Sequence, residues 1–271
     1  MHFAYTLLLL NTQGSFMKSI KLLAATAALT VSSIAVAGPN YTYLDLGFVT
    51  ADSSYKKDTG GFVLRGSFGE DLFHVGAEIA AGEANGGKGS KPIRAAEEGG
   101  GSITGTDTSG YKLYFGINPA VTDNIDLIVR VGYRADDFKG DCLDSSCYID
   151  ELSPFFVYSD DRQIEGGNYK IEQEAVFLEL GTRALITEKF ELNSYVTYSN
   201  GNTKIDQPLI EPGQSNRDSF AQWAYRVGGE YYFTEMFSAG VGLRMVTARE
   251  NFTESETEDV AEGSIHVRVN F

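Results

Sequence analysis

Apolar and polar residues alternate with a period of two along most of the chain after residue 38. In the first such segment, Leu44, Leu46 and Phe48 alternate with Asp45 and Gly47. Successive side chains of a β-strand point to opposite faces, so each segment has one apolar and one polar face. Ten segments share the pattern, at 43–48, 62–68, 73–79, 111–117, 125–134, 176–183, 192–198, 222–231, 237–245 and 264–271. We therefore predict an all-β fold of about ten strands, with eight as the alternative.

The connections between these segments alternate between short and long. Short links are expected at 69–71, 118–124, 187–189 and 234–236, and long polar links at roughly 50–59, 82–108, 135–173, 200–219 and 248–261. Tight turns on one side and long loops on the other are typical of a transmembrane, antiparallel, up-and-down β-barrel in a bacterial outer membrane. The alternative, a soluble barrel or sandwich, would bury its apolar face.

Aromatic residues are expected at the ends of the apolar face, as in the girdles of membrane barrels. We assign to these girdles Tyr41, Phe73, Tyr111, Tyr133, Tyr198, Tyr231, Phe237 and Phe271. The composition agrees with long strands, since 30 Gly, 15 Tyr and 17 Phe stand against 6 Pro.

The first 37 residues have the pattern of a cleavable signal peptide. Lys18 and Lys21 supply a basic region, Leu22 begins an apolar stretch, and Ala35 and Ala37 form a small-x-small cleavage site. We assign residues 1–37 to the signal peptide, with translation starting at either Met1 or Met17, and residues 38–271 to the barrel. A retained membrane anchor is the alternative. The net charge of −15 disfavours nucleic acid as a partner.

The polar face of the strands carries charges of both signs, which would point into the barrel lumen. Asp45 is expected opposite Arg65, and Glu78 opposite Lys112. Such charges are tolerable inside a barrel when they are paired. They would either form a salt-bridge network that fills the lumen or line a narrow channel. The expected lumen set is Asp45, Arg65, Glu78, Lys112, Asp126, Arg130, Glu179, Arg183, Arg226, Glu230, Arg244, His266 and Arg268.

Cys142 and Cys147 are expected to form a disulfide in the longest outer loop, because an exported chain passes through an oxidising compartment. Too few thiol and imidazole groups accompany them for a metal site. No phosphate-binding Gly motif occurs either. We therefore expect no metal and no cofactor.

An enzymatic function is the least favoured hypothesis. An omptin-like protease would need an Asp-His pair at the outer rim, and no Asp-x-His occurs in the sequence. His74 is expected near a short turn and His266 in the lumen. Neither has a serine placed for a lipid-modifying hydrolase.

The end of the chain resembles the small outer-membrane barrels of Gram-negative bacteria, the OmpA-, OmpX- and OmpW-like family. The resemblance covers residues 39–271 and is most specific at Ile265, Val267, Val269 and Phe271, which look like the family's assembly signal. It implies the outer-membrane assembly machinery, membrane lipid and lipopolysaccharide as partners. We expect a non-enzymatic barrel for membrane integrity or for surface interaction through its outer loops. A narrow porin-like channel for ions or small solutes is the alternative.

Overall fold

The computed structural model describes residues 41–53, 56–70, 72–84, 103–149, 162–206, 217–250 and 258–271. Its strands are β1 (Tyr43–Ser53), β2 (Lys56–Glu70), β3 (Phe73–Ala84), β4 (Ile103–Ile117), β5 (Ala120–Thr122), β6 (Ile125–Ile149), β7 (Arg162–Thr187), β8 (Phe190–Asp206), β9 (Arg217–Tyr232), β10 (Phe237–Glu250) and β11 (Glu258–Asn270). In these ranges no helix is long and apolar enough to cross a membrane.

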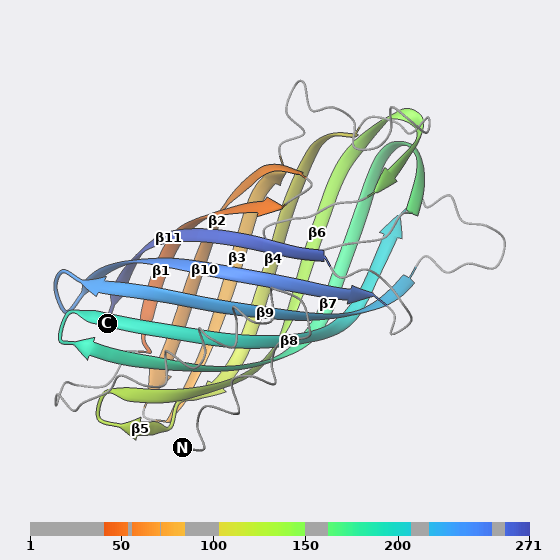
Figure 1. Cartoon of the computed structure of the whole chain (residues 1–271). Coiled ribbons are helices and arrows are strands. Elements are labelled where there is room, and N and C mark those ends of the chain that lie inside the picture. Colours follow the sequence, from red (N-terminus) through yellow and green to blue (C-terminus); the bar gives the residue numbers. More distant parts are fainter. Residues whose placement is uncertain are drawn as a thin grey trace, which may run out of the picture. The chain divides into compact units, whose positions relative to one another are not determined.

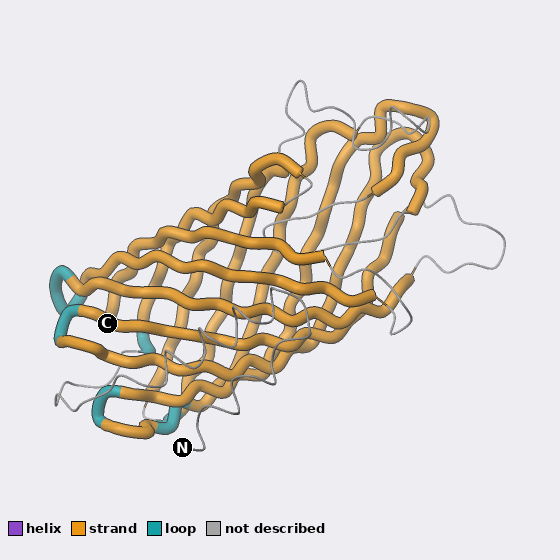
Figure 2. The backbone as a smooth tube through the Cα atoms, viewed as in Figure 1, coloured by secondary structure: helices purple, strands orange, loops and turns teal. Residues whose placement is uncertain are grey.

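Ten of the strands form one closed, antiparallel barrel (Figures 1 and 2). From β1 to β4 and from β6 to β11, each strand pairs with the next one in sequence. The pairings of β4 with β6 and of β1 with β11 complete the ring. The short strand β5 lies outside the ring and pairs with β6 near a short turn. The predicted fold class and the predicted count of ten strands are therefore confirmed.

The strands at the long-loop end extend further than the sequence pattern indicates. Strands β6 and β7 have 25 and 26 residues and pair as far as Ile149 and Arg162. They occupy much of the range 135–173 that the sequence assigns to a loop, and the other long links are shortened in the same way. The prediction was wrong there because backbone hydrogen bonds can continue past the membrane without apolar alternation in the side chains. Figure 1 shows these two strands projecting beyond their neighbours.

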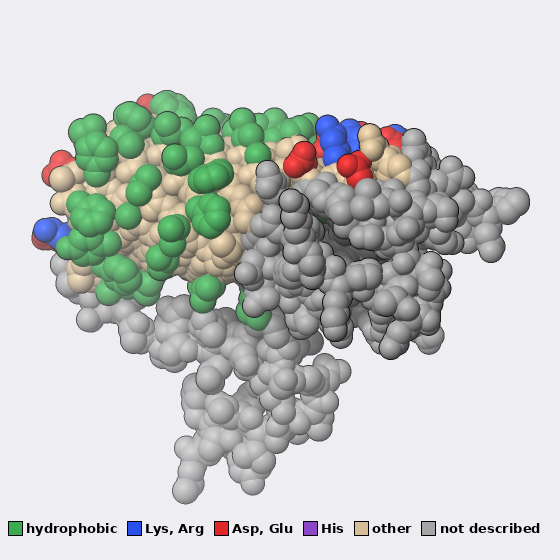
Figure 3. Space-filling view, turned by 90° about the horizontal axis from the view of Figure 1, so that it is seen from above, with side chains coloured by type: hydrophobic (Ala, Val, Ile, Leu, Met, Phe, Trp, Pro, Cys, Tyr) green, Lys and Arg blue, Asp and Glu red, His purple; other side chains and the backbone are tan. Residues whose placement is uncertain are grey.

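The outer surface of the barrel is apolar over a continuous band. Phe62 and Leu243 are each 65% exposed, and Leu46 is 54% exposed. Figure 3 shows hydrophobic side chains over one length of the barrel surface, with charged side chains at the end that carries the short turns and beyond the apolar band. A soluble barrel would bury such residues, whereas a lipid bilayer accommodates them.

One residue of the predicted girdles points the other way. Tyr41 is only 6% exposed, and its hydroxyl donates to Asp126 Oδ2 at 3.0 Å. Its ring stacks on His74 with centroids 5.1 Å apart. Tyr41 has the same parity as Asp45, so the period of two places both inside, and the assignment of Tyr41 to the exterior was wrong. The other predicted girdle residues lie on the outer face, fully or partly exposed.

Candidate functional site

The interior of the barrel contains many buried charged side chains. Because side chains alternate across each strand, the residues opposite the apolar band all point into the lumen. Asp45, Glu191 and Glu230 are fully buried there, and Arg183 is 2% exposed. Buried charged side chains are tolerated only when they have partners. Their contacts therefore determine whether the lumen can conduct solutes or bind a ligand.

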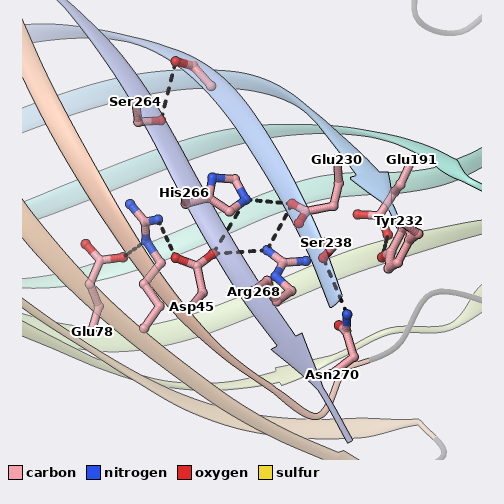
Figure 4. A network of polar contacts seen from close by, with 12 residues as sticks. Asp45, Glu78, Glu191, Glu230, Tyr232, Ser238, Ser264, His266, Arg268 and Asn270 are labelled. Atoms are coloured by element: carbon pink, nitrogen blue, oxygen red, sulfur yellow. Dashed lines mark hydrogen bonds and ion pairs between the residues drawn. The ribbon is translucent and has the colours of Figure 1, made fainter. Parts of the chain in front are cut away.

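One cluster is centred on Asp45 of β1 (Figure 4). Its carboxylate lies 3.3 Å from Arg65 Nη1 on β2 and 3.3 Å from Arg268 Nη2 on β11. His266 Nε2 lies 2.6 Å from Glu230 Oε2 and 3.6 Å from Asp45. Arg268 also lies 3.7 Å from Glu230, so the cluster joins β2, β1, β11 and β9, which lie along one side of the barrel.

A second cluster occupies the opposite wall. Arg130 donates from Nε to His74 Nε2 at 2.8 Å and from Nη1 to Glu179 Oε1 at 2.9 Å. A guanidinium only donates, so His74 Nε2 must accept, and the neutral ring then donates from Nδ1 to Asn118 Oδ1 at 3.0 Å. His74 is therefore held as one neutral tautomer and has no free nitrogen for acid–base chemistry.

A third group of contacts lies near the short turns. Arg183 pairs with Glu191 at 2.7 Å, and Tyr232 donates its hydroxyl to the same carboxylate at 2.8 Å. The Arg183 guanidinium also lies 4.6 Å from the centre of the Tyr41 ring. The buried residues of the three clusters lie in the half of the lumen nearest the short turns.

A cavity of about 100 Å³ remains further along the lumen, toward the long hairpins. Four ion pairs line it: Arg65 with Glu78, Lys112 with Glu179, Arg134 with Asp136, and Arg244 with Glu262. Arg226 also lines it. Beyond it, the buried inward side chains of the outer half include apolar ones, such as Phe138, Ile171, Phe220 and Val246, and polar ones, such as Gln173 and Gln222.

The structure places all the residues of the expected lumen set on the inner face, but their pairing differs in part. Asp45 and Arg65 are register neighbours and form an ion pair, as expected. Glu78 and Lys112 are register neighbours too, yet Lys112 Nζ lies 3.1 Å from Glu179 and Glu78 pairs with Arg65 at 2.8 Å. The predicted position of Glu78 opposite Lys112 is therefore confirmed, while the lysine reaches Glu179 and lies over the Phe177 ring, 4.4 Å from its centre.

Several lumen residues were not among those singled out from the sequence. Tyr43, Tyr114 and Tyr195 fill space around Arg130 and Arg268. Asp136 and Glu262 complete two of the ion pairs at the cavity. The alternation along their strands was the signal that these tyrosines point inward. Asp136 lies in a stretch that the sequence assigned to a loop, and Glu262 lies between the last predicted loop and the last predicted strand segment.

Two other groups singled out from the sequence lie outside the lumen. The side chains of Cys142 and Cys147 are not among the described ones, so the disulfide stays a prediction. Ile265, Val267, Val269 and Phe271 lie on the outer face of the last strand, with Phe271 72% exposed. No group of three or more His, Cys, Asp or Glu suited to a metal occurs within the described ranges.

No protein-family model and no curated protein matches this sequence. Solved structures of similar shape include the outer membrane protease OmpT from Escherichia coli, at 11% identity and a TM-score of 0.47, covering 85% of this chain and 94% of that one. The translocator domain of the autotransporter NalP from Neisseria meningitidis has 9% identity and a TM-score of 0.45, covering 95% and 96%. The KdgM porin has 8% identity and a TM-score of 0.38, covering 84% and 99%. The barrel architecture of this chain rests on its own strand pairing.

Proposed function

We propose that this outer-membrane β-barrel is a closed, non-enzymatic protein that supports membrane integrity or contacts partners at the cell surface through its long hairpins. The observation that carries the proposal is the filling of the lumen by buried, paired charges. A path for solutes would have to cross the clusters around Asp45, Arg130 and Arg183, and these residues are at most 8% exposed.

Opening such a path would separate charges that are buried together. Breaking a buried pair leaves an uncompensated charge, at a cost of about 3–5 kcal/mol for each pair. Asp45 contacts Arg65, His266 and Arg268 at once. Several contacts would have to break together, so the resting barrel is expected to exclude ions.

The histidines support a non-enzymatic role. His74 and His266 are the histidines of the described part of the chain, and they are 1% and 6% exposed. His74 is committed to Asn118 and Arg130, and His266 to Glu230. Neither lies on the part of the barrel that projects beyond the apolar band, where a soluble substrate would arrive.

The surface role rests on the projecting hairpins. Val176 is the exposed apolar residue of β7 nearest the long hairpin, and β6 and β7 remain paired well beyond it, as far as Ile149 and Arg162. Rigid strands thus carry the connecting segments away from the membrane, where loops commonly bind partners. We propose that membrane lipid and lipopolysaccharide contact the apolar outer face of the barrel, and that the outer-membrane assembly machinery recognises the last strand.

Planar-bilayer recording tests the closed lumen. We expect the refolded protein to be silent, and the double variant Glu230→Gly/Arg268→Gly to conduct, because it removes two side chains of the Asp45 cluster. Heat-dependent gel mobility verifies that both barrels are folded. Reproducible conductance of the unaltered protein would overturn the proposal of a closed barrel. It would favour the second candidate, a narrow channel, which is supported by the cavity of about 100 Å³ in the lumen.

A shortened hairpin tests the surface role. Residues 141–168 are replaced by Asn-Gly, a turn suited to joining the paired ends Gly140 and Tyr169. Cells with this variant should lose surface attachment or resistance to detergent, while the barrel still assembles. The control is Cys142→Ser/Cys147→Ser, which keeps the hairpin length. Unchanged cells with the shortened hairpin would contradict a role for this hairpin.

A further inference from the structure

The cavity in the lumen contains one more cation than its acids can pair. Five cationic side chains line it against four acidic ones. Glu78, Glu179, Asp136 and Glu262 each have a cation within 3.1 Å, namely Arg65, Lys112, Arg134 and Arg244. Among the described residues, no acid lies within ion-pair distance of the fifth cation, Arg226.

The surroundings of Arg226 make this excess unfavourable without a further anion. In the pairing of β9 with β10, Arg226 lies directly opposite Arg244, another cation. Like charges at directly opposed positions of a sheet destabilise it. Arg65 adds to the positive surroundings. The two nearby carboxylates, of Glu78 and Asp45, are already in ion pairs with Arg65. The site therefore lacks one negative charge.

We propose that the lumen cavity binds a small monocarboxylate, with its carboxylate on the Arg226 guanidinium. The planar guanidinium offers parallel N–H donors that match the two oxygens of a carboxylate. The excess of one positive charge favours a single negative charge over a doubly charged phosphate. This inference goes beyond the surface role and does not depend on it.

The size and lining of the cavity limit the rest of the ligand. One water needs roughly 10–15 Å³ of such space, so about 100 Å³ accepts a small organic ion. Val49, Ala80 and Ala224 line the cavity with aliphatic groups, and Phe177 adds an aromatic ring. A short aliphatic tail would contact these groups, which favours butyrate over formate.

Calorimetric titration of the refolded full barrel with butyrate, in a chloride-free buffer, tests the site. We expect saturable binding with one butyrate per barrel. Binding should be at least about tenfold weaker in Arg226→Gln, because this variant removes the charge-assisted hydrogen bonds to the carboxylate. Arg226→Lys keeps the positive charge but loses the parallel N–H donors of the guanidinium, so we expect an intermediate affinity for butyrate. The matched control is Arg217→Gln, an exposed arginine on the same strand, which should bind like the unaltered protein.

Each result bears on the proposal. Absence of saturable butyrate binding to the folded protein, or equal binding by Arg226→Gln, would overturn it. Tighter binding of inorganic phosphate than of butyrate would overturn the charge argument. The result of the butyrate titration is independent of the bilayer recording, because butyrate binding can be measured whether or not the barrel conducts ions.

Discussion

Arg183 holds Glu191 through two parallel hydrogen bonds across the short turn between β7 and β8. Nε donates to Oε1 at 2.8 Å and Nη2 donates to Oε2 at 2.7 Å. The two side chains are 2% and 0% exposed. This bidentate geometry is the strongest form of the pair and fixes both side chains in the lumen near the short turns.

Removal of Arg183 alone should therefore destabilise the barrel strongly. In Arg183→Ala, the carboxylate of Glu191 stays buried without its cation, and we expect the free energy of unfolding to fall by about 3–5 kcal/mol. Urea unfolding in lipid vesicles measures the loss. The double variant Arg183→Met/Glu191→Leu removes both charges and should recover most of the stability. A double variant as unstable as the single one would show that shape, and not unpaired charge, dominates.

A charge on the outer face should be costly only within the apolar band. Val131 of β6 is 53% exposed and lies beside Phe115 and Leu178. We expect Val131→Arg to lower the free energy of unfolding by about 2–4 kcal/mol, as for a cation near the bilayer midplane. The matched control is Ala135→Arg, on the same face of the same strand but nearer the water, with an expected cost of roughly 0–1 kcal/mol. Equal costs at the two positions would place the band elsewhere.

The sequence was sufficient for the architecture because a membrane barrel must show two different faces. The period of two gave the strands, and the alternation of short and long links gave their order. It was insufficient for the strand ends, since β6 continues to Ile149 in water, where neither face needs to be apolar. Tyr41 was misplaced although its parity with Asp45 pointed inward, because an aromatic residue near a strand end fits a girdle as well as a lumen.

The residues that face the lumen could be predicted from the sequence, but the contacts between their side chains could not. Parity assigned Glu78, Lys112 and Glu179 to the interior. The choice of Glu179 as the partner of Lys112 depends on side-chain reach across the lumen, which no local pattern encodes. The lack of an acidic partner for Arg226 among the described residues could not be predicted either, because it depends on the pairing of Arg244 with Glu262, a residue outside the predicted strand segments.

Gly132 is required where β6 passes beneath an aromatic ring. A Cβ added at Gly132 would overlap the carbonyl oxygen of Leu113 and lie 2.6 Å from Phe177 Cζ. The backbone of β4 cannot retreat without breaking its pairing, so Gly132→Ala should cost about 1–3 kcal/mol of unfolding free energy, as overpacking does. Gly66→Ala is the control, since its Cβ would meet only Leu44 Cδ1, at 3.8 Å. Thermal unfolding followed by gel mobility compares them, and equal midpoints would contradict the overlap.

Glu172, on the part of β7 that projects beyond the apolar band, should titrate below the ordinary range of a glutamate. A hydrogen bond from Lys170 lowers the pKa of its carboxyl group, and a second from Lys204, at 3.4 Å, lowers it further. A folded pKa below the unfolded one means that the ionised carboxylate stabilises this extension above the unfolded pKa. That contribution is lost as the pH falls through the folded pKa. It is small, because the Glu172 side chain is 34% exposed and solvent screens the pair.

The pKa of Glu172 can be measured directly by following its side-chain carboxyl carbon by NMR during an acid titration. In Lys170→Met we expect this pKa to rise toward the ordinary value, because the larger of the two hydrogen bonds is gone. Lys189→Met, in the short turn at the other end of the barrel, should leave the titration of Glu172 unchanged. If Glu172 titrates identically in Lys170→Met and in the unaltered protein, the Lys170 hydrogen bond is absent in solution. Lys170 would then be held by Asp137, whose carboxylate lies 3.1 Å from its Nζ, and Glu172 would depend on Lys204 alone.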